Sequence, residues 1–384
     1  MSKVVDNLIL GLNICIINMV KKMKKENIIK TVALLTAIIA IFIGYIYKKT
    51  KTRNLKETEG ITVVPTMYDE ISNDAAWSPT FELIWNDLKN EIVKQDIVFE
   101  EKNDIVDNLN KEYFQENMIN SNYYYKKYGL KTLKLKEEIE KGIKEKFNQE
   151  SDILNDFNWS NEELDQNDPN LKRYFFYSML YREFEYKYKF DKLEESSFKD
   201  KNNIKYFGIN KNTGDKVKSQ ITVLFYNNQD DFGISIKTKN NDEVIFYKNP
   251  EGKTFNEIYD NLLKKQSTFT DATSLRDTDT FKVPYLDFKV KKEYTELEER
   301  IFKTLDGDDC KIIKAIQSIE FQINETGGKV KSEAGMDVNK ELAIKPTEPR
   351  YFNVDDTFAL FLKESTKEVP YFALKVDDIT KYQQ

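Results

Sequence analysis

The chain of 384 residues contains no histidine and only two cysteines, Cys15 and Cys310. Without histidine it cannot build a Ser-His-Asp or Cys-His catalytic site, or a histidine-ligated zinc site. Two cysteines are too few for a cysteine metal cluster. Cys15 also lies at or beyond the apolar membrane segment described below, so the two cysteines are not expected to pair and a disulfide framework is excluded. We therefore expect no enzyme activity and no cofactor. A carboxylate-based enzyme, such as a glycoside hydrolase, is a minor alternative.

A concentrated positive charge is also absent. Lysine and arginine number 59 against 65 aspartates and glutamates, which gives a net charge of -6 spread along the chain. Nucleic-acid binding requires a positive face, so this function is not expected. The proportion of charged residues, 32%, and of aromatic residues, 13%, indicates a folded domain rather than a disordered chain.

One long apolar stretch lies near the amino terminus. Thr31–Tyr47 carries no charge, and the range 28–47 would form a helix of about 30 Å, the thickness of a bilayer core. Lysines flank both ends, so the positive-inside rule does not decide the orientation. Met23-Lys24-Lys25 before the apolar run, with no cleavage site after it, indicates an uncleaved signal anchor.

These features predict a single-pass protein of the cell membrane with its carboxy-terminal domain outside. The predicted parts are a cytoplasmic or interfacial segment at 1–27, a transmembrane helix at 28–47, a tether at 48–62 and one domain at 63–384. No Gly/Ser-rich linker and no internal repeat divides the last part.

Hydrophobic periodicity predicts an α+β domain with a helical amino-terminal half. Ser78-Pro79 predicts a helix start with Ser78 as its cap, and Lys136–Phe147 predicts a second helix. Capping boxes at Thr254–Glu257 and Thr295–Glu298 predict two more. Short apolar runs separated by Asn/Asp turns predict a strand meander at 220–226, 232–237 and 243–247.

The carboxy-terminal part has a distinctive order of elements. A strand at 315–323 leads through Asn324-Glu325-Thr326-Gly327 into a polar loop, and two apolar strands follow at 357–362 and 370–376. This order resembles the carboxy terminus of the serpins. Further segments are similar to serpin landmarks in the same order: Trp77-Ser78-Pro79, 143–154, 173–190 and 283–297. Tyr186 stands where that family has a signature tryptophan.

The resemblance implies a large antiparallel sheet and a reactive loop that can add itself to it as a strand. Its hinge would be Glu325, Thr326, Gly327 and Gly328. Alternation along a strand then places Val330, Ser332, Ala334 and Met336 on one neutral, inserting face, with charged residues on the other. A one-residue slip would bury lysines and acids at a cost of several kcal/mol each.

The resemblance also implies a partner, a protease of the serine or cysteine type that cleaves the loop. The candidate bait residues are Lys340, Glu341, Leu342 and Lys345. Inhibitory serpins have Thr or Ser in place of Gly328. The alternative is therefore a non-inhibitory surface module that uses the same scaffold to bind another surface protein.

Overall fold

The computed structural model describes residues 56–159, 173–328 and 348–383. Within these ranges no helix is long and apolar enough to cross a membrane. The predicted transmembrane helix at 28–47 and the segment at 1–27 lie outside the described residues, so both stay predictions. The described residues belong to one compact unit that starts at Lys56, and Ile61, within the predicted tether, is buried in its core.

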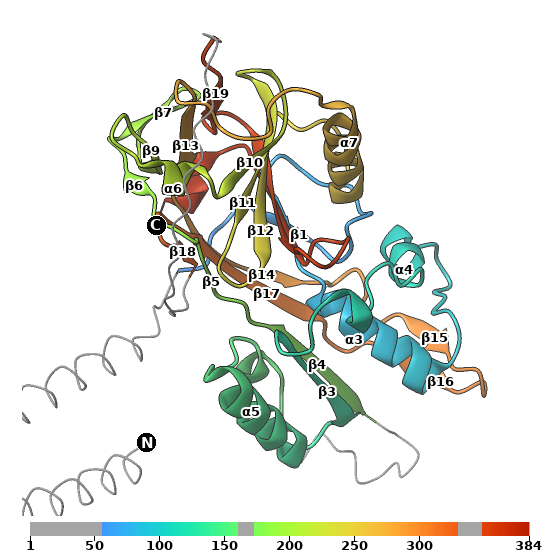
Figure 1. Ribbon diagram of the computed structural model, residues 1–384. Coiled ribbons are helices and arrows are strands. Elements are labelled where there is room, and N and C mark those ends of the chain that lie inside the picture. Colours follow the sequence, from blue (N-terminus) through green and yellow to red (C-terminus); the bar gives the residue numbers. More distant parts are fainter. Residues whose placement is uncertain (1–55, 160–172, 329–347, 384) are drawn as a thin grey trace, which may run out of the picture. The chain divides into compact units, whose positions relative to one another are not determined.

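A seven-stranded sheet forms the centre of this folded part (Figure 1). Its order is β1 (Thr62–Val64), β2 (Ala75–Trp77), β21 (Phe372–Val376), β20 (Phe358–Glu364), β12 (Asp242–Lys248), β11 (Asp231–Lys237) and β10 (Ile221–Asn228). The β1–β2 pair is parallel and the other pairs are antiparallel. The predicted meander and the carboxy-terminal hairpin are confirmed, and both lie in this sheet.

Both faces of this sheet are covered, so its central strands are buried on both sides. On one face Tyr259 of α7 (Phe255–Thr268) packs on Phe361, with 5.1 Å between ring centroids. The other face contacts a four-stranded sheet through Phe232 and Phe352, whose centroids are 5.4 Å apart. That sheet has the order β19 (Tyr351–Asn353), β13 (Thr280–Pro284), β9 (Tyr206–Ile209) and β6 (Asp191–Lys192).

The remaining helices and two hairpins lie outside these two sheets. The helices are α3 (Thr80–Asp87), which continues as a π-helical segment to Val93, α4 (Asp104–Leu109), α5 (Leu133–Phe147) and α6 (Asp215–Lys218), with 3₁₀ turns at Glu116–Met118, Leu154–Asp156 and Ile379–Tyr382. Two hairpins pair β7 (Ser196–Phe198) with β8 (Lys201–Ile204) and β15 (Ile301–Lys303) with β16 (Asp309–Lys311). The α+β class is therefore confirmed.

The predicted helix caps have different outcomes. Thr254 accepts a hydrogen bond from the Glu257 amide (3.1 Å), so that cap is confirmed. Ser78 was predicted wrongly, because α3 starts one residue later, at Thr80, and its cap position Pro79 makes no side-chain bond.

The helix predicted from Thr295 is also wrong, because turns occupy this segment. The carboxylate of Glu298 accepts from the amide of Ala315 (2.8 Å) instead of capping a helix. Tertiary packing has overridden a local signal here, since Tyr294 and Leu297 are fully buried.

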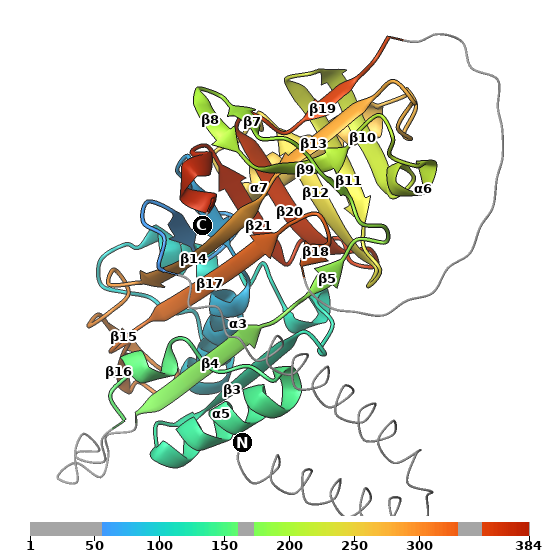
Figure 2. The ribbon, with the colours of Figure 1, turned by 90° about the vertical axis from the view of Figure 1, so that its left-hand side faces the viewer.

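The strand that leads into the polar loop does not belong to the large sheet. β17 (Ile316–Ile323) pairs with β14 (Leu286–Glu293), while β4 (Tyr174–Leu180) pairs with β3 (Tyr124–Leu130), as two separate two-stranded sheets. The expectation of one large sheet beside the loop is corrected accordingly. In Figure 2 the arrows of β17 and β4 point the same way.

Two helices, α3 and α5, pack against the strands of these two sheets. Helix α3 contacts β4. Gln317 of β17 is buried and donates to the Ser78 carbonyl (3.0 Å) and the Thr80 hydroxyl (2.9 Å) at the start of that helix. Helix α5 packs Leu135, Ile139 and Ile143 on Phe175 and Tyr177 of β4. The core beneath the loop-bearing strand is thus fixed by α3.

The buried acid of α3 generates a testable prediction. Glu82 is 1% exposed, and burial raises its pKa from 4.5 to about 8, although the Phe114 amide donates to it. Because its pKa is raised, the folded state binds the Glu82 proton more tightly than the unfolded state does. The contribution of this proton to the free energy of unfolding is complete below pH 4.5 and is lost as the pH rises towards 8. Glu82→Gln should match the wild type at pH 4 and exceed its unfolding free energy at pH 8.5, by up to about 4 kcal/mol.

Urea unfolding across this pH range measures the difference. Stability curves of variant and wild type that stay parallel from pH 4 to 8.5 would contradict the prediction.

Candidate functional site

The site begins where β17 ends and the predicted hinge starts. Gly327 and Gly328 form a short strand, β18, that pairs antiparallel with β5 (Phe184–Glu185), the continuation of β4. The register joins Gly327 to Glu185 and Gly328 to Phe184. The structure therefore brings the second half of the hinge against the strand next to β17 (Figure 2).

A tight turn reverses the chain between β17 and β18. The Gly327 amide donates to the Asn324 carbonyl (3.2 Å), and the Asn324 side chain accepts from the amide (2.9 Å) and hydroxyl (2.6 Å) of Thr326. An asparagine that binds the backbone two residues on is typical of such turns. Because of this turn, β18 runs opposite to β17.

Gly327 is the one position in the turn that requires glycine. Its φ of +111° is unfavourable for other residues, and a Cβ atom there would lie 2.6 Å from the Phe184 carbonyl oxygen and the Glu185 Cα. These are backbone atoms and cannot move aside easily. The backbone at Gly327 therefore lies directly against the backbone of β5, with no room for a side chain.

The buried side chain of Glu325 stabilises the hinge. It is 8% exposed, accepts a hydrogen bond from the Tyr285 hydroxyl (2.7 Å), and has Lys192 and Lys189 at 3.5 and 3.6 Å. Burial alone would raise the pKa of this carboxyl, but the Tyr285 bond and the two lysines outweigh it and lower the pKa. Glu325 is therefore ionised at neutral pH and holds the turn electrostatically.

The backbone of the hinge is bonded as well. The Phe190 amide donates to the Glu325 carbonyl (2.9 Å) and the Tyr186 amide donates to the Thr326 carbonyl (3.1 Å). Tyr186 and Phe190 stack edge to face with ring centroids 4.9 Å apart, and Phe207 lies within 6.0 Å of both. Burial raises the pKa of Tyr186 well above its ordinary value. A rigid aromatic cluster thus supports the hinge.

A buried ion pair follows the end of β4. Arg182 bonds both carboxylate oxygens of Asp242 (2.8 and 2.5 Å), and their side chains are 3% and 0% exposed. The guanidinium also lies 3.2 Å from the centre of the Tyr123 ring. Such a bidentate, stacked arginine fixes the segment between β4 and β5. Sequence reasoning missed this pair, because no local pattern connects residues 60 positions apart.

A second buried pair marks the place where the chain returns from the loop. Arg350, just before β19, bonds Asp279 through Nη2 (2.7 Å) and Nε (3.1 Å) and donates to the carbonyls of Ala272 and Ser274 (2.8 Å each). Its side chain is 4% exposed. The carboxy-terminal end of the loop is therefore anchored independently of the hinge. The sequence gives no signal for this pair either.

The other predicted site residues lie outside the described residues. These are the inserting face, Val330, Ser332, Ala334 and Met336, and the bait candidates, Lys340, Glu341, Leu342 and Lys345. Across residues 56–159, 173–328 and 348–383, no group of three or more His, Cys, Asp or Glu side chains could hold a metal ion.

Comparison with known proteins gives likeness in structure alone. No model of a protein family matches the chain, and no curated protein matches it in sequence. Similar solved structures include thyroxine-binding globulin in complex with thyroxine, at 14% identity over 79% of this chain and 92% of that one, with a TM-score of 0.46.

Two further structures have comparable scores. Serpin48, a highly specific serpin of the insect Tenebrio molitor, is 13% identical over 79% of this chain and 92% of that chain, with a TM-score of 0.44. Human glycosylated kallistatin is 11% identical over 79% of this chain and 91% of that one, with a TM-score of 0.47.

The hinge geometry makes a prediction about Gly327. Gly327→Ala should break the β18–β5 pairing, because the added Cβ collides with backbone and the positive φ becomes strained, at a cost of about 1–3 kcal/mol. Hydrogen exchange should then show faster exchange of the Tyr186 amide, which donates to Thr326.

Gly214→Ala is the matched control, since a Cβ at Gly214 meets nothing within 4 Å and its φ is negative. Unchanged protection of the Tyr186 amide in Gly327→Ala would show that β18 does not pair with β5.

Proposed function

We propose that the chain is a serpin-like protein of the cell surface that inhibits a protease by inserting its loop between β4 and β17. The observation that carries this proposal is the pairing of β18 with β5 in antiparallel register. Through this pairing, β18 would form the first residues of a new strand between the edges of β4 and β17. The loop would continue along the path on which the hinge already lies.

The two edges on either side of this path offer unused hydrogen-bonding groups. In the part of the chain that the structure describes, no backbone hydrogen bond joins β4 to β17. Unpaired edges are templates for an additional strand. Since β4 and β17 run the same way, a strand between them would be antiparallel to both, which is the direction β18 has relative to β5.

The observed register predicts which loop side chains would be buried. Extended without a shift, it pairs Ser332 with Leu180, Ala334 with Ser178 and Met336 with Phe176. Cross-strand partners point to the same face of a sheet. Leu180 packs against the main core, whereas the alternate residues Phe175 and Tyr177 pack under α5. The neutral face of the loop would therefore turn inward.

The charged face of the loop would turn to the opposite side. Next to the insertion path, Glu320 and Gln322 of β17 are exposed on that side. Solvent can therefore hydrate Lys329 and Lys331 there, and burial of these two charges, which would cost several kcal/mol if they were unpaired, is avoided. The alternation and the register together favour insertion in one alignment.

The proposed mechanism needs no catalytic group of this chain. The nucleophile of a serine or cysteine protease attacks a carbonyl in the loop, the peptide bond breaks, and the loop segment becomes an acyl-enzyme. The freed amino-terminal segment then inserts beside β4 and carries the protease with it, before water releases it. Arg350 keeps the other cleaved end attached to the body.

We also propose that residues 28–47 anchor the protein in the membrane with the folded part outside the cell. The absence of charge from Thr31 to Tyr47 supports the anchor. The signal-anchor pattern, Met23-Lys24-Lys25 before the apolar run with no cleavage site after it, supports the orientation. The proposed partner would then be a protease at or outside the cell surface.

Paired loop variants test the inhibitory function. Full-length protein mixed with a panel of serine and cysteine proteases should give an SDS-stable covalent complex with at least one of them. Ala334→Glu should abolish the complex and leave plain cleavage, because a charge on the inserting face costs several kcal/mol. Lys331→Glu places the same charge on the other face, at a position that is already charged, and should keep the complex.

Equal behaviour of the two variants would contradict insertion in this register. Cleavage of the wild type without a complex and without a rise in thermal stability would assign the fold to a non-inhibitory binding module.

Membrane orientation is tested separately with a carboxy-terminal tag on the full chain. External protease added to intact expressing cells should digest the tag, because it lies outside. A tag that is protected until the cells are lysed would contradict the orientation.

A further inference from the structure

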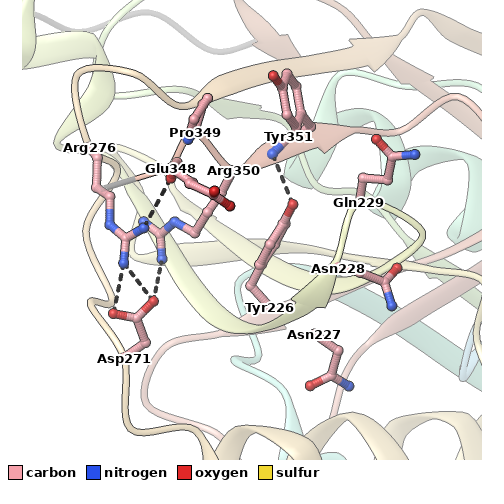
Figure 3. A pocket seen from close by; sticks show the side chains of 10 residues that line it. All are labelled: Tyr226, Asn227, Asn228, Gln229, Asp271, Arg276, Glu348, Pro349, Arg350 and Tyr351. Carbon is pink, nitrogen blue, oxygen red and sulfur yellow. Dashed lines mark hydrogen bonds and ion pairs between the residues drawn. The ribbon is translucent and has the colours of Figure 1, made fainter. Parts of the chain in front are cut away.

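A pocket of about 420 Å³ lies beside the point where the chain returns from the loop (Figure 3). Three separate segments line it: 226–229 at the turn between β10 and β11, Asp271 and Arg276 before β13, and 348–351 leading into β19. The pocket is thus built by residues distant in sequence. Its volume falls within the range of small-ligand sites.

The two arginines of the pocket are already neutralised. Arg276 donates through Nη2 to both oxygens of Asp271 (2.8 and 2.6 Å), and Arg350 is paired with the fully buried Asp279. Figure 3 shows the two guanidinium groups next to each other above Asp271. Asp271 also lies 3.8 Å from Nη1 of Arg350, so Asp271 and Asp279 together balance the two cations.

One carboxylate remains after these pairs are removed, that of Glu348. Glu348 is exposed, and among the described residues its backbone carbonyl accepts from Arg276 (3.4 Å) while its carboxylate has no partner. Uncharged acceptors line the same pocket. Asn227 uses its amide nitrogen on Asp231 (2.8 Å), which leaves its carbonyl oxygen available, and the Tyr226 hydroxyl accepts from the Tyr351 amide (3.2 Å).

We propose that this pocket binds an arginine side chain of the partner protein. A single carboxylate with amide oxygens nearby matches the donors of a guanidinium group, and the ring of Tyr226 or Tyr351 offers a face for it to stack on. Tyrosine, asparagine and arginine together are also typical of protein-binding surfaces.

The pocket adjoins the carboxy-terminal end of the loop, so a protein that takes the loop also reaches Glu348. This inference rests on the proposed function in naming that partner. The chemistry of the pocket selects a cation whether or not the partner is inhibited.

The test uses Nα-acetyl-arginine methylamide as the probe and the full-length protein in detergent, titrated by NMR. The probe should bind in the millimolar range. The citrulline analogue, which has the same shape without the charge, should bind at least about fivefold more weakly. Glu348→Gln should weaken arginine binding by at least about fivefold as well, and Glu368→Gln, an exposed glutamate in the turn before β21, should not change it.

Equal binding of arginine and citrulline, or arginine binding that Glu348→Gln leaves unchanged, would overturn the proposal. Since no protease is present in this titration, its failure is distinguishable from failure of the inhibitory function. Failure to form a covalent protease complex would leave the pocket result intact.

Discussion

The proposed function depends on one constraint, the unpaired edges of β4 and β17. Each of these strands has a partner on one side only within the described chain, and the hinge turns into the space between their ends. An unpaired strand edge can be satisfied by water, by another chain or by a segment of the same chain. Gly327 and Gly328 already pair with β5 in this way, so the chain itself is the nearest source of a further strand.

The central sheet and three buried pairs hold the parts of the molecule next to the proposed insertion path in place. The seven-stranded sheet, with α7 on one face and the β13 sheet on the other, has aromatic contacts on both faces. Three pairs of side chains anchor the hinge, the segment between β4 and β5, and the chain before β19. They are Glu325 with Tyr285, Arg182 with Asp242, and Arg350 with Asp279. If the loop inserts as proposed, these anchored ends would fix where its strand starts.

Local patterns predicted the elements that depend on local chemistry. Asn/Asp turns identify the meander, and Thr254 identifies the start of α7. The division of the loop-bearing layer into two sheets was not predictable, because strand pairing joins segments far apart in sequence. Residues 71 positions apart form the Arg350–Asp279 pair, and the burial of Tyr294 overrode the capping box beside it.

The central claim is that the loop becomes a strand between β4 and β17. Hydrogen–deuterium exchange on the full-length protein, before and after cleavage of its loop by a protease, tests this most directly. The account predicts that peptides covering 174–180, 316–323 and 328–338 gain protection together once the loop is cut. Cleavage that leaves β4 and β17 unprotected, with rapid exchange in the freed segment, would contradict it.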